Sequence, residues 1–216
     1  MNIDKNQATT QKHTLPYPIV ENDSALFSND FSDAENINPE ILKLLTTDSE
    51  KALELLLTLT KKHPDEPMLA YHLVDAYRRT NNNDLANQII RNNYRRFPHF
   101  LMIRCDYVQL CLEEDKIMEA AAALDYKFDL MTLYPKKSDF HTAEVITFQS
   151  ILVRYFCKMK DFNRAVIAFS ELKAVNANLP PIKILQNFIV MSIMENNISY
   201  ESLGLLFDFD EEEKNK

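Results

Sequence analysis

Glycine is nearly absent from this chain, since Gly204 is the only one among 216 residues. Phosphate-binding loops, dinucleotide-binding turns and nucleophile elbows all need glycine, because their backbones adopt positive φ or approach a ligand closely. The composition therefore argues strongly against those folds and sites. Helical hairpins joined by Asn, Asp and Pro need almost no glycine, so its scarcity favours an all-α fold.

Long apolar runs are also missing. No run approaches the roughly 18 residues that a membrane-spanning helix needs, so we expect no membrane insertion. The opening residues, MNIDKNQATTQKH, contain neither a basic n-region nor an apolar h-region, which indicates that no secretory signal is present. The cysteines are an odd and sparse set, Cys105, Cys111 and Cys157, which suits buried thiols in a reducing compartment. We therefore expect a cytoplasmic protein.

Positive charge is in the minority, and the formal net charge is -8. Nucleic-acid binding depends on Lys and Arg, so nucleic acid is not expected as the partner. Residues 67–99 are an exception, with five Arg against two Asp. Such a basic segment can orient an acidic partner, although solvated helix faces are the simpler explanation.

The chain divides into three parts by pattern. Residues 1–32 mix Asn, Asp, Thr and Ser without a helical period, which predicts a flexible leader. Its apolar piece, Leu15–Val20, has enough hydrophobic character to dock on this chain's own helices or on a partner, and docking into the chain's own groove would be autoinhibitory. Residues 33–207 are expected to form the helical domain, and residues 208–216 a disordered acidic tail.

Helix start and stop signals recur in the first half of the helical domain. Asn38-Pro39 predicts an N-cap followed by proline at the first helical position. The residues from Thr47 to Glu50 form a capping box before a second, strongly apolar helix that ends at Pro64. Two more helices are expected over about 67–80 and 84–96, so the rhythm is helix, short polar break, helix, proline.

Small residues recur with a fixed period. Ala52, Ala86 and Ala120 are each 34 residues apart. The large residues four positions later keep the same phase: Leu56, Ile90 and Leu124. Small side chains let the two helices of a hairpin approach closely, while large ones fill the space between hairpins. The period predicts a stack of antiparallel helical hairpins.

This pattern resembles the tetratricopeptide repeat (TPR) family. Residues 67–100 match best, and the family's signature places are held there by Leu73, Tyr77, Ala86 and Pro98. The resemblance implies a right-handed superhelical α-solenoid. A pentatricopeptide-type array that reads RNA is the structural alternative, against which the acidic composition weighs.

The later repeats are less regular. Ala165 lies 45 residues after Ala120, so about eleven residues are inserted near Tyr134–His141. A final helix pair, at about 181–195 and 199–207, is expected to cap the stack.

In TPR-like stacks the first helix of each pair lines a concave face, which implies that a partner protein or peptide segment binds in a groove. Tyr and Met would supply contact area there, and Arg would pair with carboxylates. Packing between helices is the alternative for the methionines. The residues expected in the groove are Met68, Tyr71, Asp75, Arg78, Arg79, Met102, Cys105, Gln109, Leu112, Thr147, Ser150, Arg154 and Lys158.

No set of residues predicts catalysis, a metal site or a cofactor. An HExxH motif and paired CxxC motifs are missing. Cys157 has Lys158 and Lys160 nearby, which would activate it only if it were exposed, and a packing thiol is expected instead. The sequence thus indicates a non-catalytic adaptor or scaffold. The alternative is a cytoplasmic chaperone resembling those of type III secretion translocators, and a homodimer is compatible with either role.

Overall fold

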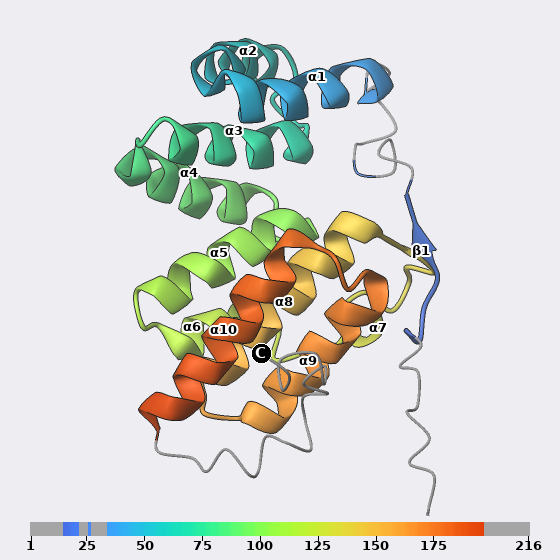
Figure 1. Ribbon diagram of the computed structural model, residues 1–216. Coiled ribbons are helices and arrows are strands. Elements are labelled where there is room, and N and C mark those ends of the chain that lie inside the picture. Colours follow the sequence, from blue (N-terminus) through green and yellow to red (C-terminus); the bar gives the residue numbers. More distant parts are fainter. Residues whose placement is uncertain (1–14, 22–25, 27–33, 197–216) are drawn as a thin grey trace, which may run out of the picture.

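The computed structural model describes residues 15–21, 26 and 34–196. In this part of the chain, ten helices pack against one another beside a single two-residue strand pairing, as Figure 1 shows. The predicted all-α class is confirmed. The helices are α1 (Ala34–Thr47), α2 (Ser49–Lys62), α3 (Pro67–Arg79), α4 (Asn83–Arg96), α5 (Leu101–Glu113), α6 (Ile117–Ala123), α7 (Leu130–Leu133), α8 (Thr142–Lys158), α9 (Phe162–Val175) and α10 (Pro180–Glu195). The strands are β1 (Ile19–Val20) and β2 (Phe140–His141).

The helices form consecutive pairs. Within the described residues, α1 packs on α2, α3 on α4, α5 on α6 and α8 on α9. The first helix of each pair also contacts the first helix of the next, from α1 to α3, α5 and α8, and α8 then contacts α10. In Figure 1 these helices follow one another down the molecule, so that α1 and α10 lie far apart.

Four alanines occupy the same position in successive helix pairs, and three of them are in the 34-residue phase. Ala52, Ala86, Ala120 and Ala165 are each the fourth residue of the second helix of a pair, and each is fully buried. A side chain of this size lets the two helix backbones come close together. The 34-residue period therefore marks the same contact in successive pairs.

The turn between the two helices of a pair is also repeated. Asn81, Asp115 and Lys160 adopt the left-handed conformation, with φ of 59°, 55° and 58°. The amide of the next residue then donates to a carbonyl five residues earlier: Asn82 to Tyr77 at 2.8 Å, Lys116 to Cys111 at 2.8 Å and Asp161 to Phe156 at 2.9 Å. This bond satisfies a carbonyl at the end of the first helix. The chain thus closes its hairpins without glycine.

The insertion breaks the second helix of the third pair. Pro98 and Pro135 follow the ends of α4 and α7, but they are 37 residues apart, whereas Pro64 and Pro98 are 34 apart. The extra residues form a break after α6 in which Asp125 and Tyr126 have positive φ. The helix resumes as α7, whose amide at Thr132 donates to the carboxylate of Asp129 at 2.9 Å. The remaining inserted residues lead through β2 into α8.

The segment Leu15–Val20 docks on the chain's own helical domain. β1 pairs in parallel with β2, with Ile19 opposite Phe140 and Val20 opposite His141. Tyr17 is buried and packs edge-on against Phe140, with ring centroids 5.0 Å apart. Of the two placements expected for this apolar piece, the structure shows the one on the chain's own helical domain. Much of residues 1–32 lies outside the described part of the chain.

The start of the helical domain also differs from the prediction. α1 begins at Ala34, so Pro39 lies inside the helix, and Asn38 is not its cap. The Asn38 side chain is buried and forms a hydrogen bond at 3.0 Å with the His72 ring of α3. The first predicted cap is therefore a buried contact between two pairs. The predicted helix at 199–207 and the acidic tail lie outside the described residues. Among the described helices, none is long and apolar enough to cross a membrane.

Candidate functional site

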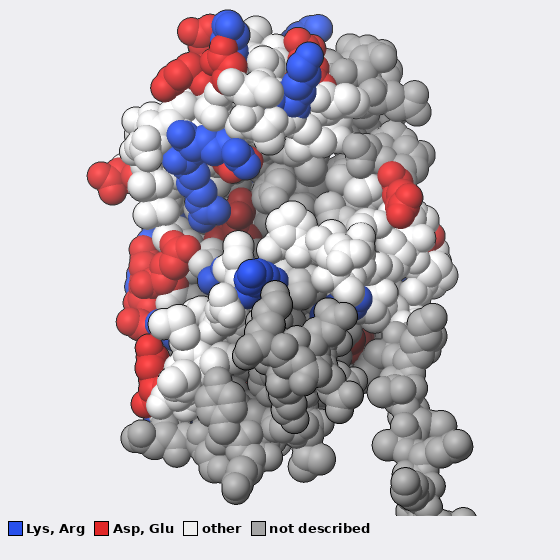
Figure 2. All heavy atoms as spheres, in the orientation of Figure 1, with Lys and Arg blue, Asp and Glu red and all other residues white. Residues whose placement is uncertain are grey.

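The first helices of successive pairs present a row of partly exposed polar side chains. On α3, Tyr71, Asp75 and Arg78 follow one another at spacings of four and three residues, which places them on one side of the helix. On α5, Asp106 and Gln109 are partly exposed and Asp106 contacts Arg78 of α3; on α8, Arg154 is partly exposed. We define the first-helix face as Tyr71, Asp75, Arg78, Arg79, Asp106, Gln109 and Arg154. Figure 2 shows that this side of the molecule is hollowed below α3, with basic side chains beside the hollow and acidic ones inside it.

Charged contacts link the side chains of this face. Arg78 of α3 reaches Asp106 of α5, with Nη1 3.5 Å from Oδ1. Arg79 donates from Nε to Asp75 at 2.9 Å, a pair along α3 in which both side chains are well exposed. Gln109 donates to Glu113 at 2.7 Å within α5. The face therefore offers both signs of charge within one short stretch.

The carboxyl of Asp106 is the most perturbed acid on the face. Burial raises its pKa to about 7, and the nearby charge of Asp75 raises it further, while the Arg78 guanidinium opposes both. Burial is also the main cause of the raised pKa of the Tyr71 hydroxyl, followed by the charges of Asp106 and Asp75. Near neutral pH, Asp106 can therefore either donate or accept a hydrogen bond.

Of the residues predicted for the groove, nine are partly or fully exposed and four are buried. The exposed ones are Tyr71, Asp75, Arg78, Arg79, Gln109, Thr147, Ser150, Arg154 and Lys158. The other four are corrected to core positions, because the exposed fraction is 3% for Met68, 2% for Met102, 1% for Cys105 and 3% for Leu112. Arg154 also serves packing, since its guanidinium lies 5.4 Å from the ring centroid of Phe188 on α10.

Sequence reasoning missed Asp106. The repeat register places Cys105 in line with Tyr71, 34 residues earlier, and so directs Cys105 to the groove. In the structure the partly exposed residue is the next one, Asp106, whose counterpart in the preceding pair is the buried His72. The sequence signal that could have identified Asp106 is the difference between the repeats: a carboxylate stands where the preceding repeat has the buried His72.

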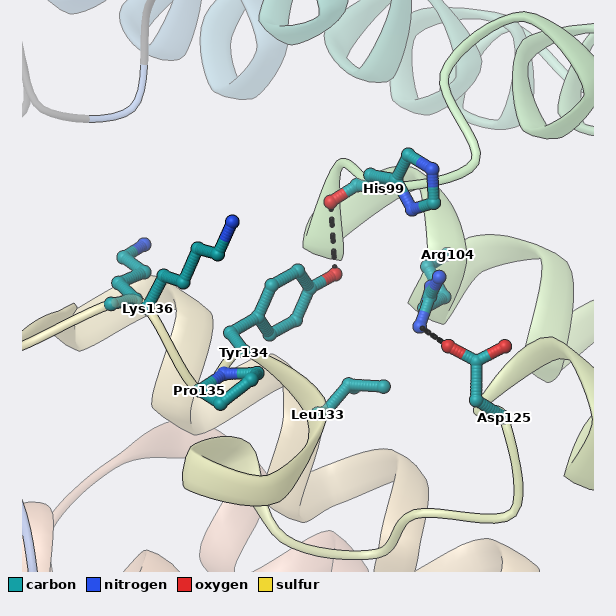
Figure 3. A pocket seen from close by; sticks show the side chains of 8 residues that line it. His99, Arg104, Asp125, Leu133, Tyr134, Pro135 and Lys136 are labelled. Carbon is teal, nitrogen blue, oxygen red and sulfur yellow. Dashed lines mark hydrogen bonds and ion pairs between the residues drawn. The ribbon is translucent and has the colours of Figure 1, made fainter.

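A second candidate site is a pocket of about 480 Å³ beside the break between α6 and α7. Its lining comes from the loop before α5, from α5 itself and from the chain around α7, as Figure 3 shows. The lining residues are His99, Arg104, Asp125, Leu133, Tyr134, Pro135, Lys136 and Lys137. We call this the α5–α7 pocket.

The central group of the α5–α7 pocket is the guanidinium of Arg104, which is 3% exposed. Its Nε donates to the carbonyl of Pro98 at 2.9 Å, and its Nη1 donates to the carboxylate of Asp125 at 3.0 Å. The ring of Tyr134 lies 5.7 Å away, from centroid to Cζ, and the Tyr134 hydroxyl donates to the carbonyl of His99 at 3.0 Å. These contacts fix the direction of the guanidinium.

The two lysines of the pocket have different surroundings. The ammonium of Lys137 contacts both carboxylate oxygens of Glu144, at 2.6 and 2.5 Å, and lies 5.0 Å from the ring centroid of Phe140. Lys136 is exposed and makes no ion pair with the described residues. The sequence did not predict this pocket, because its residues come from the broken helix and share no phase with the repeats.

The buried thiols do not have the properties of nucleophiles. Burial raises the pKa of Cys157 to about 11 and also raises the pKa of Cys105 and Cys111, so all three are protonated at neutral pH. Among the described residues, no group of three or more His, Cys, Asp or Glu side chains is placed to hold a metal ion. Comparison with family models, with curated proteins and with solved structures finds no match.

Proposed function

We propose that this protein is a non-catalytic, cytoplasmic, TPR-like α-solenoid that binds a segment of a partner protein along the first-helix face. The observation that carries the proposal is the set of partly exposed polar side chains on α3 and α5, which the contact between Arg78 and Asp106 joins across the two helices. The repeated alanine contacts and hairpin turns support the solenoid arrangement, because they hold these helices in a regular series. A rigid series of parallel helices suits an extended ligand.

The charges of the face suggest the chemistry of the partner. Arg79 is exposed on α3, and its only partner among the described residues is Asp75 on the same helix. Surface pairs of this kind are weak, so a carboxylate of the partner can compete for the guanidinium. Tyr71 and Gln109 add an aromatic surface and an amide for backbone contacts. The partner segment is therefore expected to be extended and acidic on the side that meets α3.

The test replaces one charge on the face and one elsewhere. Arg79→Glu reverses an exposed charge on the face, whereas Arg95→Glu makes the same change on α4, where Arg95 is exposed and, within the described part of the chain, bonds only to Asn92. A partner that co-purifies with the unchanged protein should lose about tenfold or more in affinity for Arg79→Glu and keep its affinity for Arg95→Glu. Helical circular dichroism should be the same for all three proteins. Equal binding by all three would refute the proposal.

A further inference from the structure

We propose that the α5–α7 pocket binds a small molecule that joins one carboxylate to an apolar body. The pocket volume of about 480 Å³ is in the range of small-molecule sites. A buried arginine from α5 lines it together with an aromatic ring and an exposed lysine from the stretch after α7 (Figure 3). The repeat architecture alone does not require such a pocket, since it exists only where the second helix of the third pair is broken.

The carboxylate preference follows from the unequal environments of Arg104 and Asp125. The Arg104 side chain is 4% exposed, whereas that of Asp125 is 54% exposed. The guanidinium is held by the Pro98 carbonyl, while the carboxylate belongs to the loop after α6. Arg binds carboxylates through a planar fork of N–H donors. A ligand carboxylate can therefore replace Asp125 on a guanidinium that is already in place.

Lys136 supplies the attraction for an anion. Of the two lysines, Lys137 is neutralised by Glu144, so its charge is not available to a ligand. Lys136 lines the same pocket and makes no ion pair with the described residues. Once Asp125 turns to solvent, Arg104 and Lys136 together leave the pocket with a surplus of positive charge. The overall charge of the chain is -8, which makes this local surplus unusual for the protein.

One side of the pocket is apolar and would contact the apolar body of the ligand. Leu133, Pro135 and the ring of Tyr134 line the pocket on the α7 side. Because the Tyr134 hydroxyl is already bonded to the His99 carbonyl, the tyrosine offers its ring rather than a hydroxyl. An aryl or short alkyl group is thus the chemistry that fits beside the guanidinium.

The pocket is distinct from the first-helix face. Arg104 and Asp106 are two residues apart on α5, which places them on nearly opposite sides of the helix. A ligand in the pocket therefore leaves the face free, and the two proposals can fail separately.

The experiment uses 3-phenylpropionate and its neutral amide, 3-phenylpropanamide, titrated into the full chain by calorimetry. We expect the acid to bind at least about tenfold more tightly than the amide, because only the acid pairs with Arg104. Asp125→Asn removes the internal competitor, and asparagine tolerates the positive φ of 52° at this position. This variant should bind the acid about fivefold more tightly than the unchanged protein does.

A pair of lysine variants completes the test without disturbing the buried arginine. Lys136→Met should weaken binding of the acid about threefold or more. Lys62→Met changes an exposed lysine at the end of α2 and should leave binding unchanged. Equal binding of acid and amide would overturn the proposal, and so would no binding of the acid to Asp125→Asn. Equal weakening by Lys136→Met and Lys62→Met would also overturn it. Thermal unfolding of each variant checks that the fold is intact.

Discussion

Arg78 Nη1 lies 3.5 Å from Asp106 Oδ1, which links α3 to α5 across the first-helix face. The contact is long for a charge pair, and the burial of the carboxyl outweighs it, so the pKa of Asp106 is raised to about 7. An acid that exchanges its proton near neutral pH therefore lies in the middle of the face proposed to bind a partner.

The first prediction concerns the pH dependence of stability. The pKa of Asp106 is higher in the folded chain than its ordinary value of 3.8, so folding takes up a proton between about pH 4 and pH 7. The contribution of Asp106 to the free energy of unfolding is therefore fully present below about pH 4 and is lost as pH rises toward 7. Between pH 5 and pH 8 we expect a loss on the order of 2 kcal/mol.

Asp106→Asn is the matched control for that measurement, because asparagine keeps the shape but does not titrate. Urea unfolding of both proteins at pH 5 and pH 8 gives the difference directly. The unchanged protein should lose stability relative to Asp106→Asn over this range. Parallel behaviour of the two proteins would show that the carboxyl keeps its ordinary pKa.

The second prediction tests the alanine contact. Ala120 is fully buried against the first helix of its pair, so Ala120→Leu should destabilise the protein by about 2 kcal/mol through overpacking. Ala122 is exposed on the same helix, and Ala122→Leu should change the free energy of unfolding by less than about 0.5 kcal/mol. Chemical unfolding measures both values. Similar values for the two variants would mean that α6 does not pack through Ala120.

The third prediction tests the turn between α8 and α9. Lys160 has a φ of 58°, a conformation that costs a non-glycine residue about 1 kcal/mol, so Lys160→Gly should raise the free energy of unfolding by about that amount. Lys173→Gly, at an exposed position inside α9, should lower it by about 1 kcal/mol. The opposite signs are the expected result in thermal unfolding. A loss of stability in both variants would contradict the left-handed turn.

The regular part of the fold was predictable because it depends on short-range patterns. The three alanines in 34-residue phase are fully buried at the same position of successive second helices, as is Ala165 after the insertion, so their spacing carries structural information directly. The predicted starts of α3 and α4 agree with the structure to within one residue. The start of α1 was predicted wrongly, because Asn38 has a buried partner in His72 that no local signal reveals.

The candidate site was less predictable, because a helix register places a residue only to within about one position. Met68, Met102 and Cys105 are buried, and Met68 belongs to a cluster with side chains of α1 and α2. Asp106, one residue further along, keeps 15% of its side chain exposed. The α5–α7 pocket depends on the break at Asp125 and Tyr126, a departure from the repeat whose geometry no periodic pattern specifies.

The pairing of Ile19–Val20 with Phe140–His141 has a consequence for the newly made chain. Tyr17 packs against Phe140, which lies more than a hundred residues later in the chain. Contacts between residues so far apart in the sequence form late in folding. During synthesis, Leu15–Val20 cannot pair until β2 has left the ribosome. Helices α1 to α5 can already pack together by then. The earliest described segment of this protein is thus among the last to find its position.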